Sequence, residues 1–524
     1  LEIGLGAAFA GARALVTMKH VGLNVAADPL FTGAYIGTRG GLVVLCADDP
    51  GMHSSQNEQD NRYYALAAKV PMLEPADSQE AYDFTRLAFE LSEKFETPVI
   101  LRTTTRVNHS KSLVTPRDPD KPAKTPHFEK DFARFVMVPA NARKRHAVLE
   151  QRLADLFLQS DATPINRVFG ETRGAKLGVV ASGVAYQYVR EVAPDLPVFK
   201  VGMSWPLPLA KIAAFQRQVR EIVVVEELAD FMLDAIRAAG IPARAKDVSF
   251  RQGELNPDRV RLILAGKPSA PPVVPPDALP PKPPVLCPGC GHRSVFATLK
   301  KLKVIVTGDI GCYTLGALQP LSSLDTCLCM GGSITVALGL ERALPPEEGR
   351  KVVAVIGDST FFHSGMTGVL DAVYNGSKGT LLILDNRTTA MTGGQDHPGT
   401  GRRLTGEMGS AADPAEVCRA LGVKDVKVLD SYDRKRLEEA IRDSLSRDEY
   451  SVIVCRRPCV LVDRQAKRGR YAVDPARCKN CGACLRLGCP AMSQAEGHVE
   501  ISAMCAGCGL CVEACRFDAI HKVQ

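Results

Sequence analysis

Residues 352–395, VVAVIGDSTFFHSGMTGVLDAVYNGSKGTLLILDNRTTAMTGGQ, decide the fold of this 524-residue chain. They contain two short apolar runs, Val352–Ile356 and Leu381–Leu384, each followed by polar turn residues. Runs of this length bounded by turn residues are typical of inner parallel strands, which are buried on both faces. The segment between them, Gly365–Asn375, is long enough to form the crossover helix of a βαβ unit. The stretch therefore predicts an α/β domain with a parallel sheet.

Polar side chains follow both predicted strands. Gly357, Asp358 and Ser359 come after the first strand, and Asn386 comes after the second. Open α/β sheets bind ligands at the carboxyl ends of their strands. Carboxylate and amide oxygens, together with a backbone carbonyl and phosphate oxygens, complete an octahedral Mg²⁺ site. A glycine lets the backbone approach a diphosphate, and the helix start behind it offers free N–H groups. The alternative is an ordinary strand-end aspartate and a turn asparagine, because any short motif carries a risk of chance matches.

This pattern resembles the diphosphate-binding signature of thiamine-diphosphate enzymes, a GD(G/S) pair followed by Asn about one βα unit later. The resemblance implies that Asp358 and Asn386 bind Mg²⁺ through their side chains and that Thr388 binds it through its carbonyl. Many members have glycine in place of Ser359, a change that the signature often allows. The cofactor-binding residues expected on this basis are Gly357, Asp358, Ser359, Asn386, Thr388, Gly331 and Ser333.

Length and composition narrow the class of protein. A chain of 524 residues is too long for one hydrophobic core, and three or four domains are expected. The net charge of +7 is small for this length and gives no reason to expect nucleic-acid binding. No apolar run reaches the length of a membrane span, and we expect neither a signal peptide nor a location other than the cytoplasm. Because no N-cap precedes the helical pattern that opens the chain, we expect native residues upstream of Leu1.

The C-terminal tail contains eight of the 17 cysteines, in two C-x2-C-x2-C motifs that are each followed by a fourth cysteine. Thiolates at this spacing surround one face of a cubane, and in two-cluster ferredoxins the fourth cysteine of each motif binds the other cluster. Four residues rather than three precede Cys489, and Arg516 rather than proline follows Cys515. A pair of zinc sites is the alternative, but a third closely spaced cysteine suits zinc less well. The predicted ligands are Cys478, Cys481, Cys484 and Cys515 for one [4Fe-4S] cluster and Cys489, Cys505, Cys508 and Cys511 for the other.

Nearer the N-terminus, βα patterns and several candidate side chains are visible. Strands are predicted at Gly41–Cys46 and Pro98–Leu101, and an amphipathic helix at Ser78–Phe95 with Ser78 as its N-cap. His53 lies in a polar loop that follows the first strand, where it either faces a substrate or is an exposed loop residue. Lys19 and His20 either meet a substrate carboxylate or form a solvated surface pair.

Further cysteines lie at or near predicted strand ends, before and after the segment 352–395. Cys287 and Cys290 form a CxxC motif that precedes His292 and a helix, which is compatible with a redox dithiol. Cys312 and Cys459 follow apolar strand-like runs of the same domain, so the four cysteines could instead bind a third cluster. The other cysteines are predicted to be small buried residues, namely Cys46, Cys327, Cys329, Cys418 and Cys455.

Over nearly its whole length the chain is similar to the large α subunits of indolepyruvate ferredoxin oxidoreductases, within the 2-oxoacid:ferredoxin oxidoreductase family. The motifs that carry this resemblance are TMKHVGLNVAADPL, DDPGMHSSQNEQDNR, CPGCGHR, GDIGCYTLG, GDSTFFHSG, LDNRTTAMTGGQDHPG and the cysteine tail, whose C-x2-C-x2-C-x4-C-P spacing is also a family habit. The resemblance implies α/β thiamine-diphosphate-binding domains with parallel sheets and helices on both faces, a second α/β domain and a two-cluster ferredoxin-like domain. The implied segments are a pyrimidine-binding domain (1–166), a transketolase C-terminal-like domain (167–266), a Pro-rich linker (267–285), a diphosphate-binding domain (286–465) and the ferredoxin-like tail (466–524).

The resemblance also implies an activity, cofactors and partners. The expected reaction is oxidative decarboxylation of an arylpyruvate (indolepyruvate, phenylpyruvate or hydroxyphenylpyruvate) with coenzyme A, which yields arylacetyl-CoA and CO₂ and sends electrons to ferredoxin. The expected cofactors are thiamine diphosphate, Mg²⁺ and two [4Fe-4S] clusters, with a possible proximal third cluster on Cys287, Cys290, Cys312 and Cys459. A smaller β subunit would complete an α2β2 assembly.

For catalysis, the resemblance implies a glutamate that activates the aminopyrimidine of the cofactor. It precedes an LE pair in the family, so here it is expected upstream of Leu1, and Glu2 is a poor substitute. The remaining catalytic candidates are His20, His53 and His292.

Three rival functions stay open at this point. A non-redox thiamine-diphosphate decarboxylase would need no clusters, so the cysteine tail argues against it. A relay subunit with an inactive cofactor site would not need both Asp358 and Asn386. Another subtype of 2-oxoacid:ferredoxin oxidoreductase would differ in its substrate, which residue patterns do not reveal.

Overall fold

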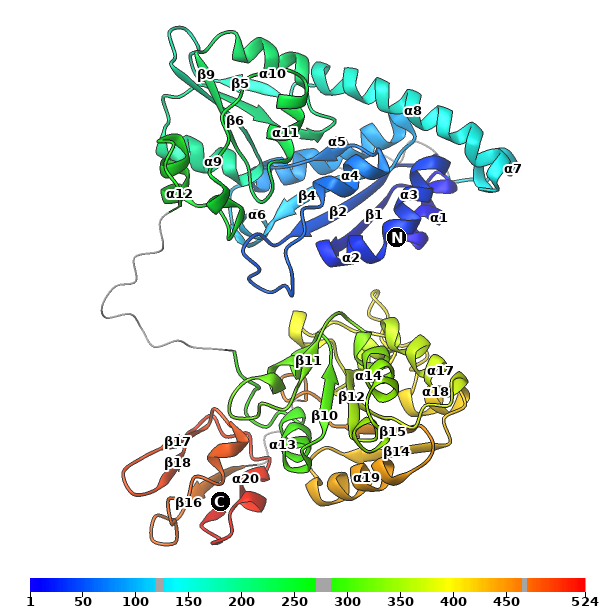
Figure 1. The fold of residues 1–524 in the computed structure, drawn as a ribbon, viewed down its shortest axis with the longest axis vertical. Coiled ribbons are helices and arrows are strands. Elements are labelled where there is room, and N and C mark those ends of the chain that lie inside the picture. The colour runs from blue at the N-terminus through cyan, green and yellow to red at the C-terminus, as the bar shows by residue number, and fades with distance from the viewer. Residues whose placement is uncertain (119–125, 270–283, 464–468, 524) are drawn as a thin grey trace. The chain divides into compact units, whose positions relative to one another are not determined.

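The computed structural model describes residues 1–118, 126–269, 284–463 and 469–523, and it divides into two units, Leu1–Pro276 and Asp277–Gln524 (Figure 1). Each unit contains sheets in which most neighbouring strands of the larger sheets run parallel, with helices packed on them, which confirms the predicted α/β class. The Pro-rich linker predicted at 267–285 lies mostly outside the described residues.

The first unit begins with a five-stranded sheet in the order β1-β2-β4-β3-β8. All neighbours in it run parallel except β8, which pairs antiparallel with β3. The strands are β1 (Ala14–Lys19), β2 (Leu42–Asp48), β3 (Met72–Leu73), β4 (Val99–Thr104) and β8 (Met203–Trp205). The predicted strands at Gly41–Cys46 and Pro98–Leu101 are β2 and β4. Because β8 comes from the segment 167–266, that segment contributes to the sheet of the segment before it.

Among the described residues before β5, eight helices flank this sheet or lead away from it. The predicted helix Ser78–Phe95 is present, but its N-cap is Asp77, whose side chain accepts a hydrogen bond from the Glu80 N–H, so the prediction of Ser78 as cap was wrong. The helices are α1 (Glu2–Phe9), α2 (His20–Val25), α3 (Ala27–Ile36), α4 (Arg62–Ala68), α5 (Ser78–Phe95), α6 (Thr105–His109), α7 (Phe132–Phe135) and α8 (Pro139–Ala162).

A four-stranded sheet in the order β5-β7-β6-β9 completes the first unit. Its strands are β5 (Arg167–Phe169), β6 (Leu177–Ser182), β7 (Val198–Val201) and β9 (Glu221–Val225). The accompanying helices are α9 (Gly183–Val192), α10 (Leu209–Gln216), α11 (Phe231–Ala238), η1 (Val248–Arg251) and α12 (Pro257–Leu264). Strands and helices therefore alternate along this segment, as they do in an α/β domain.

The second unit is built on a six-stranded parallel sheet in the order β11-β10-β12-β13-β15-β14. Its strands are β10 (Ile305–Gly308), β11 (Thr326–Cys327), β12 (Val352–Gly357), β13 (Thr380–Asp385), β14 (Asp425–Asp430) and β15 (Ser451–Arg456). From β10 the chain goes to one side for β11 and to the other for β12. A ligand crevice is expected where the strand order reverses in this way, outside the carboxyl ends of β10 and β12.

Helices cover both faces of this sheet, which explains the unbroken apolar runs in the sequence. Val353 and Val355 of β12 pack with α13 and α19, whereas Ala354 and Ile356 pack on the opposite face with α14, α17 and α18. The helices are α13 (His292–Leu302), η2 (Cys312–Ala317), α14 (Gly332–Ala343), α15 (Pro346–Gly349), α16 (Asp358–Thr360), η3 (Phe361–Gly365), α17 (Met366–Tyr374), η4 (Ala390–Thr392), α18 (Pro414–Ala420) and α19 (Arg434–Ser446).

The C-terminal tail packs a small core between two antiparallel strand pairs, β16 with β19 and β17 with β18. Val499, Ile520 and Cys484 are buried in this core. The elements are β16 (Arg470–Val473), η6 (Leu485–Leu487), β17 (Met492–Gln494), β18 (Val499–Ile501), α20 (Leu510–Ala514) and β19 (Ile520–Val523). In the described ranges, no helix has both the length and the apolar character needed to cross a membrane.

Candidate functional site

Asp358 stands where β12 ends and α16 begins, with only 3% of its surface exposed. Its Oδ1 accepts a hydrogen bond from the Ser359 N–H at 2.9 Å, and its Oδ2 accepts one from the Arg387 N–H at 2.8 Å. Gly357 must lack a side chain because a Cβ there would lie 2.6 Å from the Tyr313 ring. Hydrogen bonds from the backbone N–H groups of Ser359 and Arg387 therefore hold the Asp358 carboxylate at the carboxyl edge of the sheet.

Asn386 follows the neighbouring strand β13. The next residue, Arg387, is the one whose N–H donates a hydrogen bond to Asp358. The Thr388 N–H donates to Asn386 Oδ1 at 3.2 Å, and Asn386 Nδ2 lies 3.4 Å from His292 Nε2. Thr388 is itself buried, at 5% exposure. The structure thus brings the three residues predicted to bind Mg²⁺ to the ends of two adjacent strands.

The donors at this edge suit a hard cation better than a soft one. Within the described ranges, no three histidine, cysteine, aspartate or glutamate side chains converge on a position for one metal ion. The expected Mg²⁺ set includes only one such side chain, Asp358, and takes its other donors from an amide, a backbone carbonyl and phosphate oxygens. This chemistry fits Mg²⁺ shared with a diphosphate.

Asp309, which the sequence analysis did not single out, organises the neighbouring loop after β10. Its Oδ2 accepts hydrogen bonds from the Gly331 N–H and the Ser333 hydroxyl, both at 3.0 Å, and its Oδ1 accepts one from the Tyr313 hydroxyl. Burial raises the pKa of Asp309 to about 6. Gly331 and Ser333 were predicted to bind the cofactor. In the structure the Gly331 N–H and the Ser333 hydroxyl point toward Asp309 instead of into open space. The signal for Asp309 was a second Gly-Asp pair, Gly308-Asp309, at a strand end.

Two histidines contact the predicted metal ligands. His292 begins α13 and is buried, which lowers the pKa of its ring to about 4 and keeps it neutral. His397 lies in the loop after β13, and its Nε2 is 3.2 Å from Asp358 Oδ2. His292 was among the predicted catalytic residues, whereas His397 was missed although it lies within a family-like motif.

The four cysteines considered for a third cluster gather on one side of the same domain. Burial raises the pKa of Cys290 to about 12, with nearby Cys287 and Cys312 adding to the effect. Burial likewise raises the pKa of Cys312 to about 11, with Cys459 and Cys287 as its neighbours. The Cys459 N–H donates to the Asn386 carbonyl at 3.0 Å, so this cysteine is tied directly to the predicted metal site.

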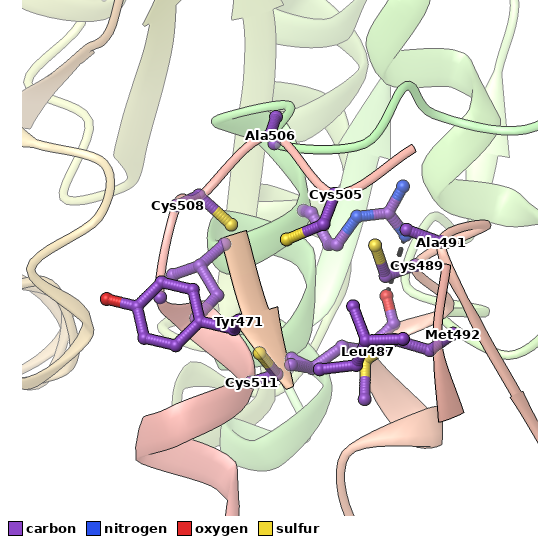
Figure 2. A pocket seen from close by; sticks show the side chains of 14 residues that line it. Tyr471, Leu487, Cys489, Ala491, Met492, Cys505, Ala506, Cys508 and Cys511 are labelled. Atoms are coloured by element: carbon purple, nitrogen blue, oxygen red, sulfur yellow. Dashed lines mark hydrogen bonds between the residues drawn. The ribbon is translucent and has the colours of Figure 1, made fainter. Parts of the chain in front are cut away.

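The eight tail cysteines line two separate pockets. Cys489, Cys505, Cys508 and Cys511 surround one of them, and Figure 2 shows their sulfur atoms turned toward a shared space beside Tyr471 and Leu487. Cys478, Cys481, Cys484 and Cys515 line the other. In each pocket the fourth cysteine comes from the opposite motif, the exchange expected of a two-cluster ferredoxin.

Arg293 joins the first tail pocket to the α/β domain. Its guanidinium is buried and donates to the Leu487 carbonyl at 2.7 Å and to the Leu286 carbonyl at 2.5 Å. Gly289 of the CxxC loop packs against Ala506, so closely that a Cβ at Gly289 would come within 2.8 Å of it. The CPGC loop therefore lies between the sheet and the tail.

In the first unit, Lys19 and His20 occupy the turn from β1 into α2. Lys19 Nζ donates to the Ser54 carbonyl at 2.8 Å and lies 3.6 Å from Asp49 Oδ2, and partial burial lowers its pKa. His20 is fully buried, with Nε2 3.3 Å from the Asn57 carbonyl oxygen. Lys19 and Asp49 thus form a locally neutral pair, and His20 is not a solvated surface residue.

His53 and Glu2 are the more exposed candidates of this unit. His53 Nε2 lies 3.2 Å from Glu254 Oε2, with 43% of the His53 side chain exposed. The Glu2 side chain is 77% exposed.

The remaining cysteines divide into two groups. Cys46, Cys418 and Cys455 are buried, as predicted. Cys327 and Cys329 are exposed, so the prediction that they are buried was wrong. They lie where β11 leads into the loop before α14. In the part of the chain that the structure describes, β11 is an edge strand that pairs only with β10.

Comparison with known proteins agrees with this arrangement. The family model "Pyruvate flavodoxin/ferredoxin oxidoreductase, thiamine diP-bdg" matches residues 2–163, "Thiamine pyrophosphate enzyme, C-terminal TPP binding domain" matches residues 309–455, and "4Fe-4S binding domain" matches residues 499–521. The indolepyruvate oxidoreductase subunit IorA of Methanothermobacter thermautotrophicus is 41% identical, with 99% of this chain and 88% of that protein covered. The protein of the same name from Archaeoglobus fulgidus is 38% identical, over 100% of this chain and 88% of that protein.

A solved structure shows a weaker likeness. The 2-oxoglutarate:ferredoxin oxidoreductase from Magnetococcus marinus aligns with 49% of this chain and 54% of its own, at 16% identity and a TM-score of 0.40. A likeness at this level supports no inference about function.

Proposed function

The chain belongs to the family of indolepyruvate oxidoreductase subunit IorA, and from this membership we propose that it is the catalytic subunit of an arylpyruvate oxidoreductase. The coarser assignment, a ferredoxin-dependent 2-oxoacid oxidoreductase with thiamine-diphosphate and 4Fe-4S domains, follows from the relatives and family models. The proposal adds the substrates (indolepyruvate, phenylpyruvate and hydroxyphenylpyruvate), coenzyme A as acyl acceptor, and arylacetyl-CoA and CO₂ as products. A smaller β subunit is proposed to complete an α2β2 enzyme.

One observation carries the proposal: the backbone of Arg387 joins the two predicted Mg²⁺ ligands at the edge of a parallel sheet. Asp358 accepts the Arg387 N–H, and Asn386 directly precedes Arg387 in the chain. An aspartate that only ended a strand would have no reason to be buried with an asparagine side chain beside it. We propose that Asp358, Asn386 and the Thr388 carbonyl hold Mg²⁺, and that the N–H groups at the start of α16 face the diphosphate.

The residues around this edge have distinct proposed roles. Bound thiamine diphosphate supplies the nucleophilic carbon and the electron sink for decarboxylation. The neutral ring of His292 can accept a hydrogen bond from the Asn386 amide nitrogen. The amide oxygen, which accepts the Thr388 N–H, would then face the metal with its second lone pair. Asp309 holds the Gly331–Ser333 turn through two hydrogen bonds.

The cysteines supply the proposed route for electrons. Oxidative decarboxylation releases two electrons, and each cubane carries one at a time. We propose that Cys287, Cys290, Cys312 and Cys459 bind a proximal cluster, because Cys459 is hydrogen-bonded to Asn386 and Gly289 packs on the tail loop. The two tail clusters would then lead electrons outward to ferredoxin.

Replacing Asp358 by alanine tests the proposed function. In the purified chain with its β subunit, Asp358→Ala should abolish arylpyruvate- and CoA-dependent dye reduction and leave the absorption of the tail clusters unchanged. Asp371→Ala, an exposed change on α17 of the same domain, is the matched control and should retain activity. Turnover by Asp358→Ala at the wild-type rate would refute the metal site, and a wild-type enzyme inactive on all three arylpyruvates would refute the substrate class.

A further inference from the structure

His397 is a buried ring held rigidly against the proposed diphosphate site. Its side chain is 5% exposed and lies against Phe362, with ring centroids 6.0 Å apart and planes 30° from parallel. Gly399 packs against both rings, because a Cβ there would come within 2.7 Å of Phe362 and 2.8 Å of the His397 ring. The ring therefore has little room to turn.

The turn that carries His397 is tied to the same residue that fixes Asp358. The Thr400 N–H and hydroxyl both donate to the His397 carbonyl at 2.9 Å, which closes a tight turn. The Arg387 guanidinium donates to the Gly399 carbonyl at 3.1 Å, while the Arg387 N–H donates to Asp358. Arg387 thus sets the distance between the histidine and the aspartate.

Hydrogen bonding identifies which ring nitrogen carries the proton. The Gly399 N–H donates to His397 Nδ1 at 3.1 Å, so Nδ1 must present a lone pair. In the neutral ring the proton then lies on Nε2, which becomes a donor. A metal bound at Nε2 would require the proton on Nδ1, where it would face the Gly399 N–H. His397 is therefore built to donate and not to bind the metal.

The Nε2 donor is buried and lacks a well-aligned acceptor in the described residues. It lies 3.2 Å from Asp358 Oδ2 but makes no hydrogen bond of good geometry, and Oδ2 already accepts the Arg387 N–H. A buried polar group without a partner is costly, and such groups are rare unless a ligand satisfies them. The orphaned donor points to an anionic ligand beside the Asp358 carboxylate.

We propose that His397 binds the cofactor directly, by donating its Nε2–H to an oxygen of the diphosphate that shares the metal with Asp358. This inference rests on the proposed function, which places a diphosphate at this edge of the sheet. It adds a binding residue that lies outside the Gly-Asp-Ser and Asn signature. The donor would compensate negative charge where the carboxylate and the diphosphate come together.

Two substitutions of His397 distinguish the contribution of the Nε2–H donor from that of the rest of the ring. Glutamine at position 397 places an amide N–H where Nε2 lies, whereas asparagine reaches only as far as Nδ1 and keeps an acceptor for the Gly399 N–H. The cofactor-stripped enzyme, as the full chain with its β subunit, would be titrated with thiamine diphosphate at saturating Mg²⁺ by calorimetry. We expect His397→Gln to bind within about 3-fold of wild type and His397→Asn to bind about 10- to 100-fold more weakly.

The possible outcomes are distinct. Equal affinity of His397→Asn and wild type would overturn the inference, and so would equally weak binding by both variants, because that would indicate a role of the ring in packing. The titration would be repeated at limiting Mg²⁺. A deficit of His397→Asn that appears there but not at saturating Mg²⁺ would show that the residue acts only through Asp358 and the metal, which also contradicts direct binding. A wild-type enzyme that binds no thiamine diphosphate would refute the proposed function itself. Unchanged absorption of the iron–sulfur clusters shows that each variant has folded.

Discussion

The backbone N–H of Arg387 donates a 2.8 Å hydrogen bond to Asp358 Oδ2, which ties the residue after β13 to the end of β12. Arg387 adopts a left-handed backbone conformation, with φ of 59°, that turns its N–H toward the neighbouring strand. Its side chain approaches Asp385 and binds the Gly399 carbonyl. Arg387, which lies between the predicted ligands Asn386 and Thr388, thus links three segments at this edge of the sheet.

The ion pair between Asp385 and Arg456 should be important for the stability of this edge. Asp385 is 2% exposed, and Arg456 Nε lies 2.7 Å from its Oδ2. Arg456→Met should lower the free energy of unfolding by about 3 kcal/mol, because it leaves a buried carboxylate short of a partner. Denaturant unfolding would measure the change. Arg442→Met, which removes an exposed pair with Glu438, should cost less than about 1 kcal/mol, and an equal loss in both variants would contradict the prediction.

Arg293 should couple the tail to the α/β domain. Arg293→Met removes the hydrogen bonds to the Leu487 and Leu286 carbonyls and leaves the buried Leu487 carbonyl short of a donor. We expect ferredoxin reduction to fall at least about 10-fold while thiamine diphosphate binding is retained, because the proposed route of the electrons crosses the contact between the CPGC loop and the tail. Stopped-flow measurement of ferredoxin reduction in the presence of substrate would test this. Arg486→Met, an exposed change on the tail, is the control and should behave as wild type.

Iron analysis should separate the three proposed clusters. The wild-type chain should contain about twelve iron atoms if the proximal set binds a cubane, and about eight if only the tail does. Cys312→Ser, Cys484→Ser and Cys511→Ser should each remove about four irons, since each belongs to a different set. Cys418→Ser changes a buried cysteine outside all three sets and should leave the iron content unchanged. Eight iron atoms in both the wild type and Cys312→Ser would show that the proximal set binds no cluster.

Glu227 should make the first unit less stable as the pH rises. Burial raises its pKa to about 7, and its carboxyl group accepts a hydrogen bond from the Leu255 N–H at 3.1 Å. Between pH 4.5 and 7 the unfolded chain has released a proton that the folded chain keeps, so stability falls with rising pH in this window and levels off above it.

Glu227→Gln removes this titration and keeps the acceptor. At pH 8 it should be more stable than wild type by up to about 3 kcal/mol, and the difference should shrink toward zero as the pH approaches 4.5. Thermal unfolding at a series of pH values would show it. Glu191→Gln, at an exposed position, should show no such trend. A constant difference across the series would mean that Glu227 is ionised throughout.

Part of the fold was predictable because burial on both faces leaves a mark in the sequence. The run Val352–Ile356 alternates between two helical layers, so every residue in it is apolar, and the strand was correctly predicted. The N-cap of α5 was assigned to Ser78 when Asp77 makes the capping bond, since both residues can cap a helix and only the backbone turn selects one. Cys327 was expected in a core, but it lies on an edge strand, and strand order is not visible in a local pattern.

By itself, the sequence determined which residue types stand at strand ends and how the tail cysteines are spaced, because both depend on short-range periodicity. Tertiary structure decided which of these ends meet: that Arg387 bridges Asp358 and Asn386, that Asp309 holds the turn at Gly331, and that His397 brings an unpaired donor to the same place. The physical reason is that a hydrogen bond depends on distance and direction in space. Residues 358 and 397 are far apart along the chain, and only the packing of strands and loops brings their side chains within 3.2 Å.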